Sequence, residues 1–243
     1  MKKYFTLLLI VVVLPVLSLV YFTVEIAEPV DRVFLSISTF LYSIFTGFFI
    51  SRQASRFNKV RETVTKFDGL MSNIYRTSGH ISANLQQEIG LVVTAHYDKI
   101  FATKEWNYHF KRKSTTLSSI HDLLEKHIDD KKVTKLANQS IGAIVKGLGV
   151  AQDVRKSMLA LSRERVPFEQ WVLIMFFVAM LIGTVSTMAS VGMIWPSVLK
   201  AAFVMSVLSV MFILYRLNNL AFTEDLMGAE SAQDVLDIIT GSK

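Results

Sequence analysis

The sequence contains no cysteine, has only four prolines, and carries charged side chains at only 19% of its 243 positions. Without cysteine the chain can form no disulfide framework, no thiolate nucleophile and no cysteine-ligated zinc site. Soluble chains carry roughly 25% charged residues, so this low value and the 51% hydrophobic content favour a membrane protein. The net charge of +6 then fits an anionic membrane leaflet better than nucleic acid, and no nucleic-acid partner is expected.

Four apolar stretches approach the roughly 20 residues that are needed to span a lipid bilayer. They are residues 4–22, 33–50, 171–191 and 198–215. The first stretch follows Lys2 and Lys3, as a signal peptide would, but its apolar core is too long and no small-residue cleavage motif follows it. We therefore expect four transmembrane helices, with the lipid bilayer as the first partner of the chain.

Basic residues gather beside one end of each apolar stretch. They are Lys2, Lys3, Arg52, Arg56, Lys59, Arg61, Arg163, Arg165 and Arg216. Because basic flanks stay on the cytoplasmic side, both termini and the region between the second and third stretches are predicted to be cytoplasmic. The sequence thus predicts a multi-pass protein of the cell inner (plasma) membrane.

The region between the two pairs of spans is polar, and its apolar residues recur at helical spacing. This spacing predicts helices around residues 81–100, 117–128 and 136–161. The expected fold is all-α, with four transmembrane helices and a helical cytoplasmic domain inserted between spans two and three. The expected parts are a transmembrane hairpin at 1–51, the helical domain at 52–167, a second hairpin at 168–217 and a cytoplasmic tail at 218–243.

One stripe of residues runs from the second span into the polar region, at alternating spacings of three and four. Its members are Ser36, Thr39, Ser43, Thr46, Ile50, Gln53, Phe57, Val60, Val64, Phe67, Met71 and Ile74. The unbroken period predicts that the second span continues as one helix of about 40 residues, with one face persisting throughout. The stripe carries hydroxyls where lipid favours apolar groups and apolar groups where water favours polar ones, so we expect it to be hidden from both.

Two explanations fit the stripe. In the first, its small residues let helices approach closely in lipid, while its apolar part packs on the chain's own helices. In the second, several copies of the helix surround an axis and line a water-filled path with apolar constrictions. The candidate pore-lining residues are Ser36, Thr39, Phe40, Ser43, Thr46, Gly47, Ile50, Gln53 and Phe57, and Lys200 is the candidate for an outer mouth that attracts anions.

No residue pattern indicates a catalytic site, a metal site or a cofactor site. The five histidines form neither an H-E-x-x-H motif nor a pair four residues apart, so no metal site is predicted. Gly142, Gly147 and Gly149 follow no strand and precede no Lys-Ser or Lys-Thr, which argues against a phosphate loop. We therefore expect no catalytic residue, no cofactor and no enzymatic activity.

The chain resembles the bestrophin-like membrane proteins of prokaryotes. The resemblance rests on the tracts Gly47–Arg76 and Tyr97–Trp106, on the order of spans and cytoplasmic helices, and on the segment 217–239 after the fourth span. That segment resembles the family's Asn-Pro-Phe-like core, with Ala221 in place of the proline. Bestrophins proper are pentameric anion channels whose second span lines the pore with a phenylalanine-rich neck.

The resemblance implies a homo-oligomer, a pentamer if it is bestrophin-like, whose second span lines an ion path. Phe40 alone combines aromatic character with proximity to the hydroxyl stripe. Only Glu224 and Asp225 stand where calcium-gated bestrophins carry a dense acidic cluster, so calcium control is not expected. The leading hypothesis is an oligomeric ion channel or pore, with anion selectivity left open. The alternative is a membrane-anchored scaffold or signalling adaptor without transport.

Overall fold

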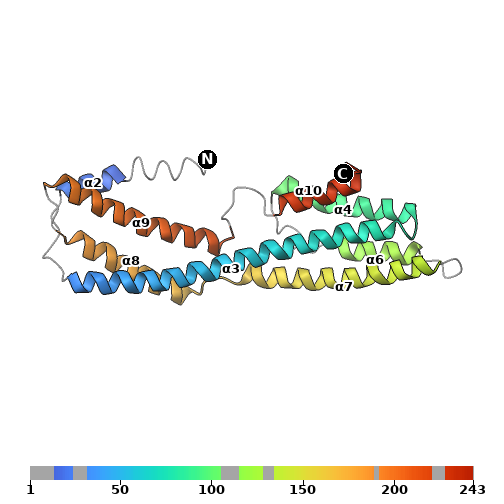
Figure 1. The fold of residues 1–243 in the computed structure, drawn as a ribbon, viewed down its shortest axis with the longest axis horizontal. Helices are drawn as coiled ribbons and strands as arrows, with labels where there is room; N and C mark the ends of the chain where they lie inside the picture. The colour runs from blue at the N-terminus through green and yellow to red at the C-terminus, as the bar shows by residue number, and fades with distance from the viewer. Residues whose placement is uncertain are drawn as a thin grey trace. The chain divides into compact units, whose positions relative to one another are not determined.

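The computed structural model describes residues 14–23, 32–104, 115–127, 134–188, 192–220 and 228–242. All regular structure in these residues is helical, as the sequence predicts, and none of them forms a strand (Figure 1). The helices are α2 (Leu14–Thr23), α3 (Arg32–Ser78), α4 (Ala83–Thr103), α6 (Thr116–His127), α7 (Lys135–Arg163), α8 (Phe168–Ser186), α9 (Ile194–Asn218) and α10 (Ala229–Thr240).

Helix α3 is the single long helix that the stripe predicts. It runs for 47 residues without a break, which corresponds to about 70 Å at 1.5 Å per residue. Neither Gly47 nor Gly69 interrupts it, and no proline occurs within it. The helix therefore carries the end of the second apolar stretch directly into the polar region of the chain.

The prediction that one face of this helix persists throughout is wrong. The stripe repeats every seven residues, and a straight α-helix drifts by about 20° per heptad relative to that repeat. From Ser36 to Met71 the drift adds up to about 100°. The stripe consequently begins on an exposed face of α3 and ends on its buried face.

Three of the described helices are long and apolar enough to cross a membrane, namely α3, α8 and α9. Helices α3 and α9 contain the second and fourth predicted spans. Helix α8 ends at Ser186 and so covers only part of the predicted third span at 171–191, of which residues 189–191 lie outside the described ones. Of the first predicted span, only α2 belongs to the described residues, and residues 4–13 lie outside them. A fourth transmembrane helix and the orientation of the termini therefore stay predictions.

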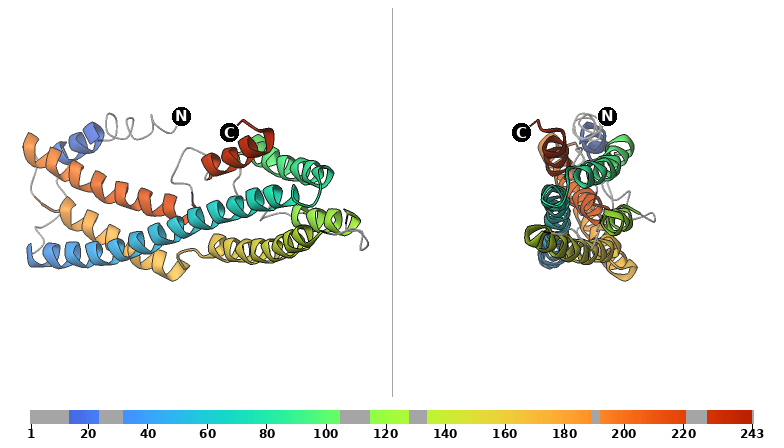
Figure 2. Two further views of the ribbon diagram at one scale, coloured as in Figure 1. Left: turned by 45° about the vertical axis from the view of Figure 1, so that its right-hand side comes forward. Right: turned by 90° about the vertical axis from the view of Figure 1, so that its right-hand side faces the viewer.

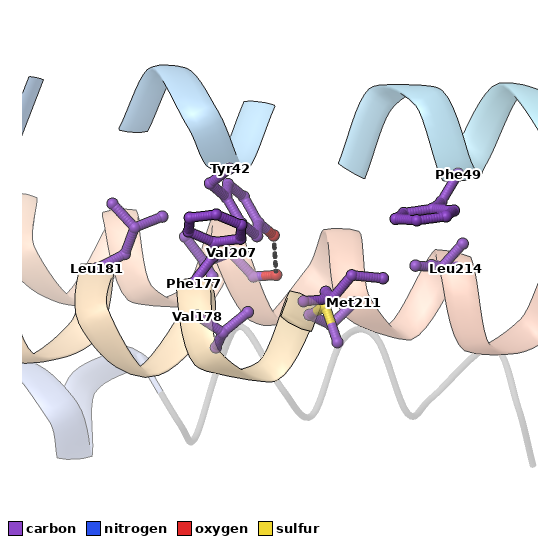
Figure 3. Close-up of a cluster of buried hydrophobic side chains, with 9 residues drawn as sticks. Tyr42, Phe49, Phe177, Val178, Leu181, Val207, Met211 and Leu214 are labelled. Atoms are coloured by element: carbon purple, nitrogen blue, oxygen red, sulfur yellow. Dashed lines mark hydrogen bonds between the residues drawn. The ribbon is translucent and has the colours of Figure 1, made fainter. Parts of the chain in front are cut away.

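The described residues form two compact units, and α3 contributes to both. The first unit contains the residues up to Ser55 together with 165–220. Its core joins α3, α8 and α9 through Tyr42, Phe49, Ile174, Phe177, Val178, Leu181, Val207, Met211 and Leu214. Figure 3 shows Tyr42 and Phe49 reaching from α3 toward this core, where the Tyr42 hydroxyl donates to the carbonyl oxygen of Val207 at 3.2 Å.

The second unit contains Arg56–Glu164 and residues 228–242. Its core includes the apolar part of the stripe, because Val60, Val64, Phe67, Met71 and Ile74 are all buried within the one chain. The apolar part of the stripe therefore agrees with the first explanation, in which it packs on the chain's own helices. The burial of these five side chains therefore requires no second copy of the protein.

The ends of the helices in the second unit are capped by side chains. The Ser82 hydroxyl accepts from the backbone N–H of Leu85 at 3.1 Å, and Thr134 caps α7 in the same way. At the other end of α7, the buried guanidinium of Arg56 donates to the carbonyl oxygens of Leu161 at 2.7 Å and Ser162 at 3.1 Å. These bonds satisfy backbone groups that helix ends leave without partners, so they fix where α3 and α7 meet.

Candidate pore-lining face of α3

The apolar part of α3, residues 33–50, exposes one side that divides into two strips. One strip is large and apolar and consists of Val33, Phe34, Ile37, Ile44 and Phe48. The other, which we call the serine strip, consists of Ser36, Phe40, Ser43 and Gly47. At 3.6 residues per turn the spacings of four, three and four place the serine strip along one line beside the apolar strip.

The serine strip combines small and polar groups with one large aromatic ring. The Ser43 hydroxyl donates to the carbonyl oxygen of Thr39 at 2.8 Å, so its oxygen still offers lone pairs outward. Phe40 lies between the two serines and is 65% exposed. A Cβ atom added at Gly47 would meet no other atom within 4 Å, so the strip is open at that position. Hydroxyl oxygens can solvate ions or water, and an exposed ring can narrow a path.

The other predicted lining residues do not share this strip. Thr46 and Gln53 are only 2% and 1% exposed, so they point into the chain. Thr39 and Phe57 are half-buried, and Ile50 packs partly against the core of the first unit. Members of the stripe that are three residues apart differ in direction by about 60° at 3.6 residues per turn, which separates Thr46 from Ser43. The heptad drift then turns the later members further toward the interior of the chain.

Lys200, the predicted mouth residue, is almost fully buried in the single chain, at 6% exposure. Its ammonium donates to the carbonyl oxygens of Ser186, at 3.4 Å, and Met188, and lies 5.3 Å from the centre of the Tyr21 ring. The Tyr21 hydroxyl is also hydrogen-bonded to the Ser186 hydroxyl at 3.0 Å. Lys200 therefore donates to backbone carbonyls at the end of α8 and just after it, where a cation is favoured by the helix dipole.

Sequence reasoning missed two features of the structure. The predicted tail contains a helix, α10, and the only signal for it was the apolar spacing of Ala232, Val235 and Ile239. It also missed Asn218, whose side-chain oxygen accepts from the backbone N–H of Val166 at 2.8 Å and joins the end of α9 to the approach to α8. A buried asparagine at a helix end has no distinctive sequence pattern.

Within the described ranges, no three histidine, aspartate or glutamate side chains gather closely enough to hold a metal ion. The segment with Ala221, Phe222, Glu224 and Asp225 lies outside those ranges. What the site offers is therefore a neutral, partly hydroxylated surface on a membrane-length helix.

Comparison with known proteins identifies the family of the chain. No curated protein and no solved structure matches the sequence. The family model of the bestrophin-like domain matches residues 5–221. Because that match covers most of the 243 residues, the chain belongs to the bestrophin-like family.

Proposed function

We propose that the protein is an oligomeric membrane channel in which the serine strip of α3 lines the ion path. The observation that carries this proposal is the exposure of two serines and a glycine along one line of α3, within residues 33–50, whose other exposed side chains are all apolar. Lipid contact would favour apolar side chains at these positions, as the neighbouring apolar strip has. Family membership supports a channel-type membrane protein.

The position of the strip requires more than one chain to form the path. The strip lies on the outside of the single chain, so one copy cannot enclose a path with it. Several copies of α3 around a common axis would turn the serine strips toward one another and leave the apolar strips facing lipid or neighbouring helices. A closed ring of identical subunits is the common way to build such an axis.

Transport through such a path is passive. Hydroxyl oxygens replace part of the water around a passing ion, while a ring of Phe40 side chains forms an apolar constriction that can empty of water. The strip itself carries no charge, and exposed basic residues, among them Arg52, Lys59 and Arg61, follow it along α3. A local excess of positive charge raises the concentration of anions, which favours anion flux.

Flux from vesicles tests this function directly. Purified protein in lipid vesicles loaded with potassium chloride should release chloride, potassium or both, and native mass measurement should find an oligomer. Protein-free vesicles, and vesicles with heat-unfolded protein, are the controls. An intact oligomer without flux of either ion would reject the channel and favour the scaffold alternative.

A further inference from the structure

Asp68 is a buried carboxyl group on α3 in the second unit. It is only 4% exposed and accepts hydrogen bonds from the Tyr97 hydroxyl of α4, at 2.7 Å, and from the Ser231 hydroxyl of α10. Among the described residues, no lysine, arginine or histidine forms an ion pair with it. A carboxyl group this deep normally has a cation as a partner, so its position calls for an explanation.

One of its two donors belongs to a short helix at the end of the chain. Helix α10 begins after the residues that the family model matches, and Figure 2 shows it lying beside α4. Ser231 is in the first turn of α10, and Ala232 and Val235 are the two residues of this helix that are buried. The Tyr75 hydroxyl donates to the carbonyl oxygen of Ile239 at 3.3 Å, near the other end of α10.

The start of α10 fits tightly against α3. Gly228 has a φ of +77°, a conformation that favours glycine, and a Cβ atom added there would lie 2.5 Å from a methyl carbon of Val64. The helix is thus attached by two hydroxyl contacts and by a close approach, and it buries only two residues fully. Leu236, Ile238 and Ile239 are half-buried. A helix of 12 residues with only two fully buried side chains therefore detaches at a lower cost in free energy than the longer helices that form the core of the unit.

We propose that α10 is a proton-sensitive latch, which is closed on α3 and α4 when Asp68 is protonated and released when Asp68 is ionised. A neutral carboxyl group can stay buried between Tyr97 and Ser231 at little cost. An ionised carboxylate is stabilised by hydration. When α10 detaches, Ser231 moves away with it and water can reach Asp68. This inference concerns the second unit alone and does not rest on the channel proposal.

The electrostatic surroundings support this direction. Burial raises the pKa of Asp68 from 3.8 to about 6, against the lowering effect of the hydrogen bonds from Ser231 and Tyr97. From α4 the group faces Tyr97, whose own pKa is raised by burial and by Asp68. His96, beside Tyr97, is hydrogen-bonded to Thr116 at 2.9 Å, and the acidic Glu230 and Asp234 of α10 are exposed.

The direction of the pH dependence of α10 docking follows from the raised pKa of Asp68. The docked state holds the proton more tightly than the released state, so docking is strongest below about pH 4 and weakens as pH rises through about 6. If release returns the carboxyl group to its ordinary pKa, the docking equilibrium changes on the order of a hundredfold over this range. Above about pH 7 no further change is expected.

Hydrogen exchange on the full chain in nanodiscs tests the latch. Peptides that cover residues 229–240 should be more protected at pH 4.5 than at pH 7.5, after correction for the intrinsic pH dependence of exchange. Asp68→Asn should keep the protection of the acidic state at both pH values, because asparagine is neutral. Asp98→Asn, at an exposed position on α4, is the matched control and should behave like the parent.

Two more variants keep the test decisive if Asp68→Asn folds poorly. Tyr97→Phe removes a donor to the carboxylate, so the midpoint of the pH change should move to higher pH. Gly228→Ala should expose α10 at every pH. The latch is rejected if parental protection of α10 does not change with pH, if Asp68→Asn retains the change, or if the Tyr97→Phe midpoint stays in place or falls.

Discussion

Replacing Met71 with aspartate should unfold the second unit, and it should not merely dissociate an oligomer into folded subunits. Met71 is completely buried in the core that α3 forms with the other helices of that unit. Removing a buried methionine side chain costs about 2–5 kcal/mol, and burying an unpaired carboxyl group adds a further cost of similar size. The sum approaches the whole stability of a typical domain, about 5–15 kcal/mol.

Thermal unfolding followed by circular dichroism in detergent measures this effect, with limited proteolysis to locate it. Asn73→Asp is the matched control, because it adds a carboxylate two residues away on an exposed position of α3. The control should melt close to the parent. A Met71→Asp protein that stays folded but runs as a smaller species would instead make the apolar stripe an interface between subunits.

Replacing Phe40 with alanine should increase ion flux through the reconstituted protein. Phe40 is the only large side chain of the serine strip, and its ring is mostly exposed in the single chain. If a ring of these side chains limits the path, trimming it widens the constriction and favours wetting. A barrier lower by about 1.4 kcal/mol corresponds to a flux about tenfold higher.

The matched control for Phe40→Ala is Ile37→Ala, which shortens another exposed side chain, on the apolar strip. It should leave flux unchanged, because in the proposed ring the apolar strip contacts lipid or a neighbouring helix and does not line the path. Both variants should keep the parental oligomer in native mass measurements. Equal effects of the two variants would assign Phe40 to lipid or helix packing, and a stability loss without added flux would do the same.

The continuity of α3 was predictable because it depends on a local property, the recurrence of residues at helical spacing without proline. Its partition into exposed and buried faces was not, since this depends on which helices pack against it. Thr46 and Ser43 have the same chemical character and lie in one heptad stripe, yet Thr46 is buried and Ser43 is exposed. They are three residues apart, so at 3.6 residues per turn their side chains point about 60° apart, and the packing of the other helices decides which of the two directions is buried.

Lys200 and Asp68 show the same limit for charged residues. A lysine one turn into an apolar stretch predicts an interfacial or mouth residue, whereas in the single chain Lys200 is buried against carbonyls at the end of α8 and just after it. Asp68 received no prediction, because no residue near it in the sequence marks it as buried. Its donors, Tyr97 and Ser231, lie 29 and 163 positions away, so only the folded chain brings them together.

Cysteine accessibility along α3 tests the central claim most directly, and the chain has no cysteine of its own to interfere. Single substitutions Ser36→Cys, Ser43→Cys and Gly47→Cys place thiols on the serine strip, and Ile37→Cys and Ile44→Cys place them on the apolar strip. A charged, water-soluble thiol reagent should react with the first group in the reconstituted oligomer and block its ion flux, while the second group should neither react nor lose flux. Reaction and block at the apolar strip, with the serine strip inert, would contradict the assignment of this face of α3 to an ion path.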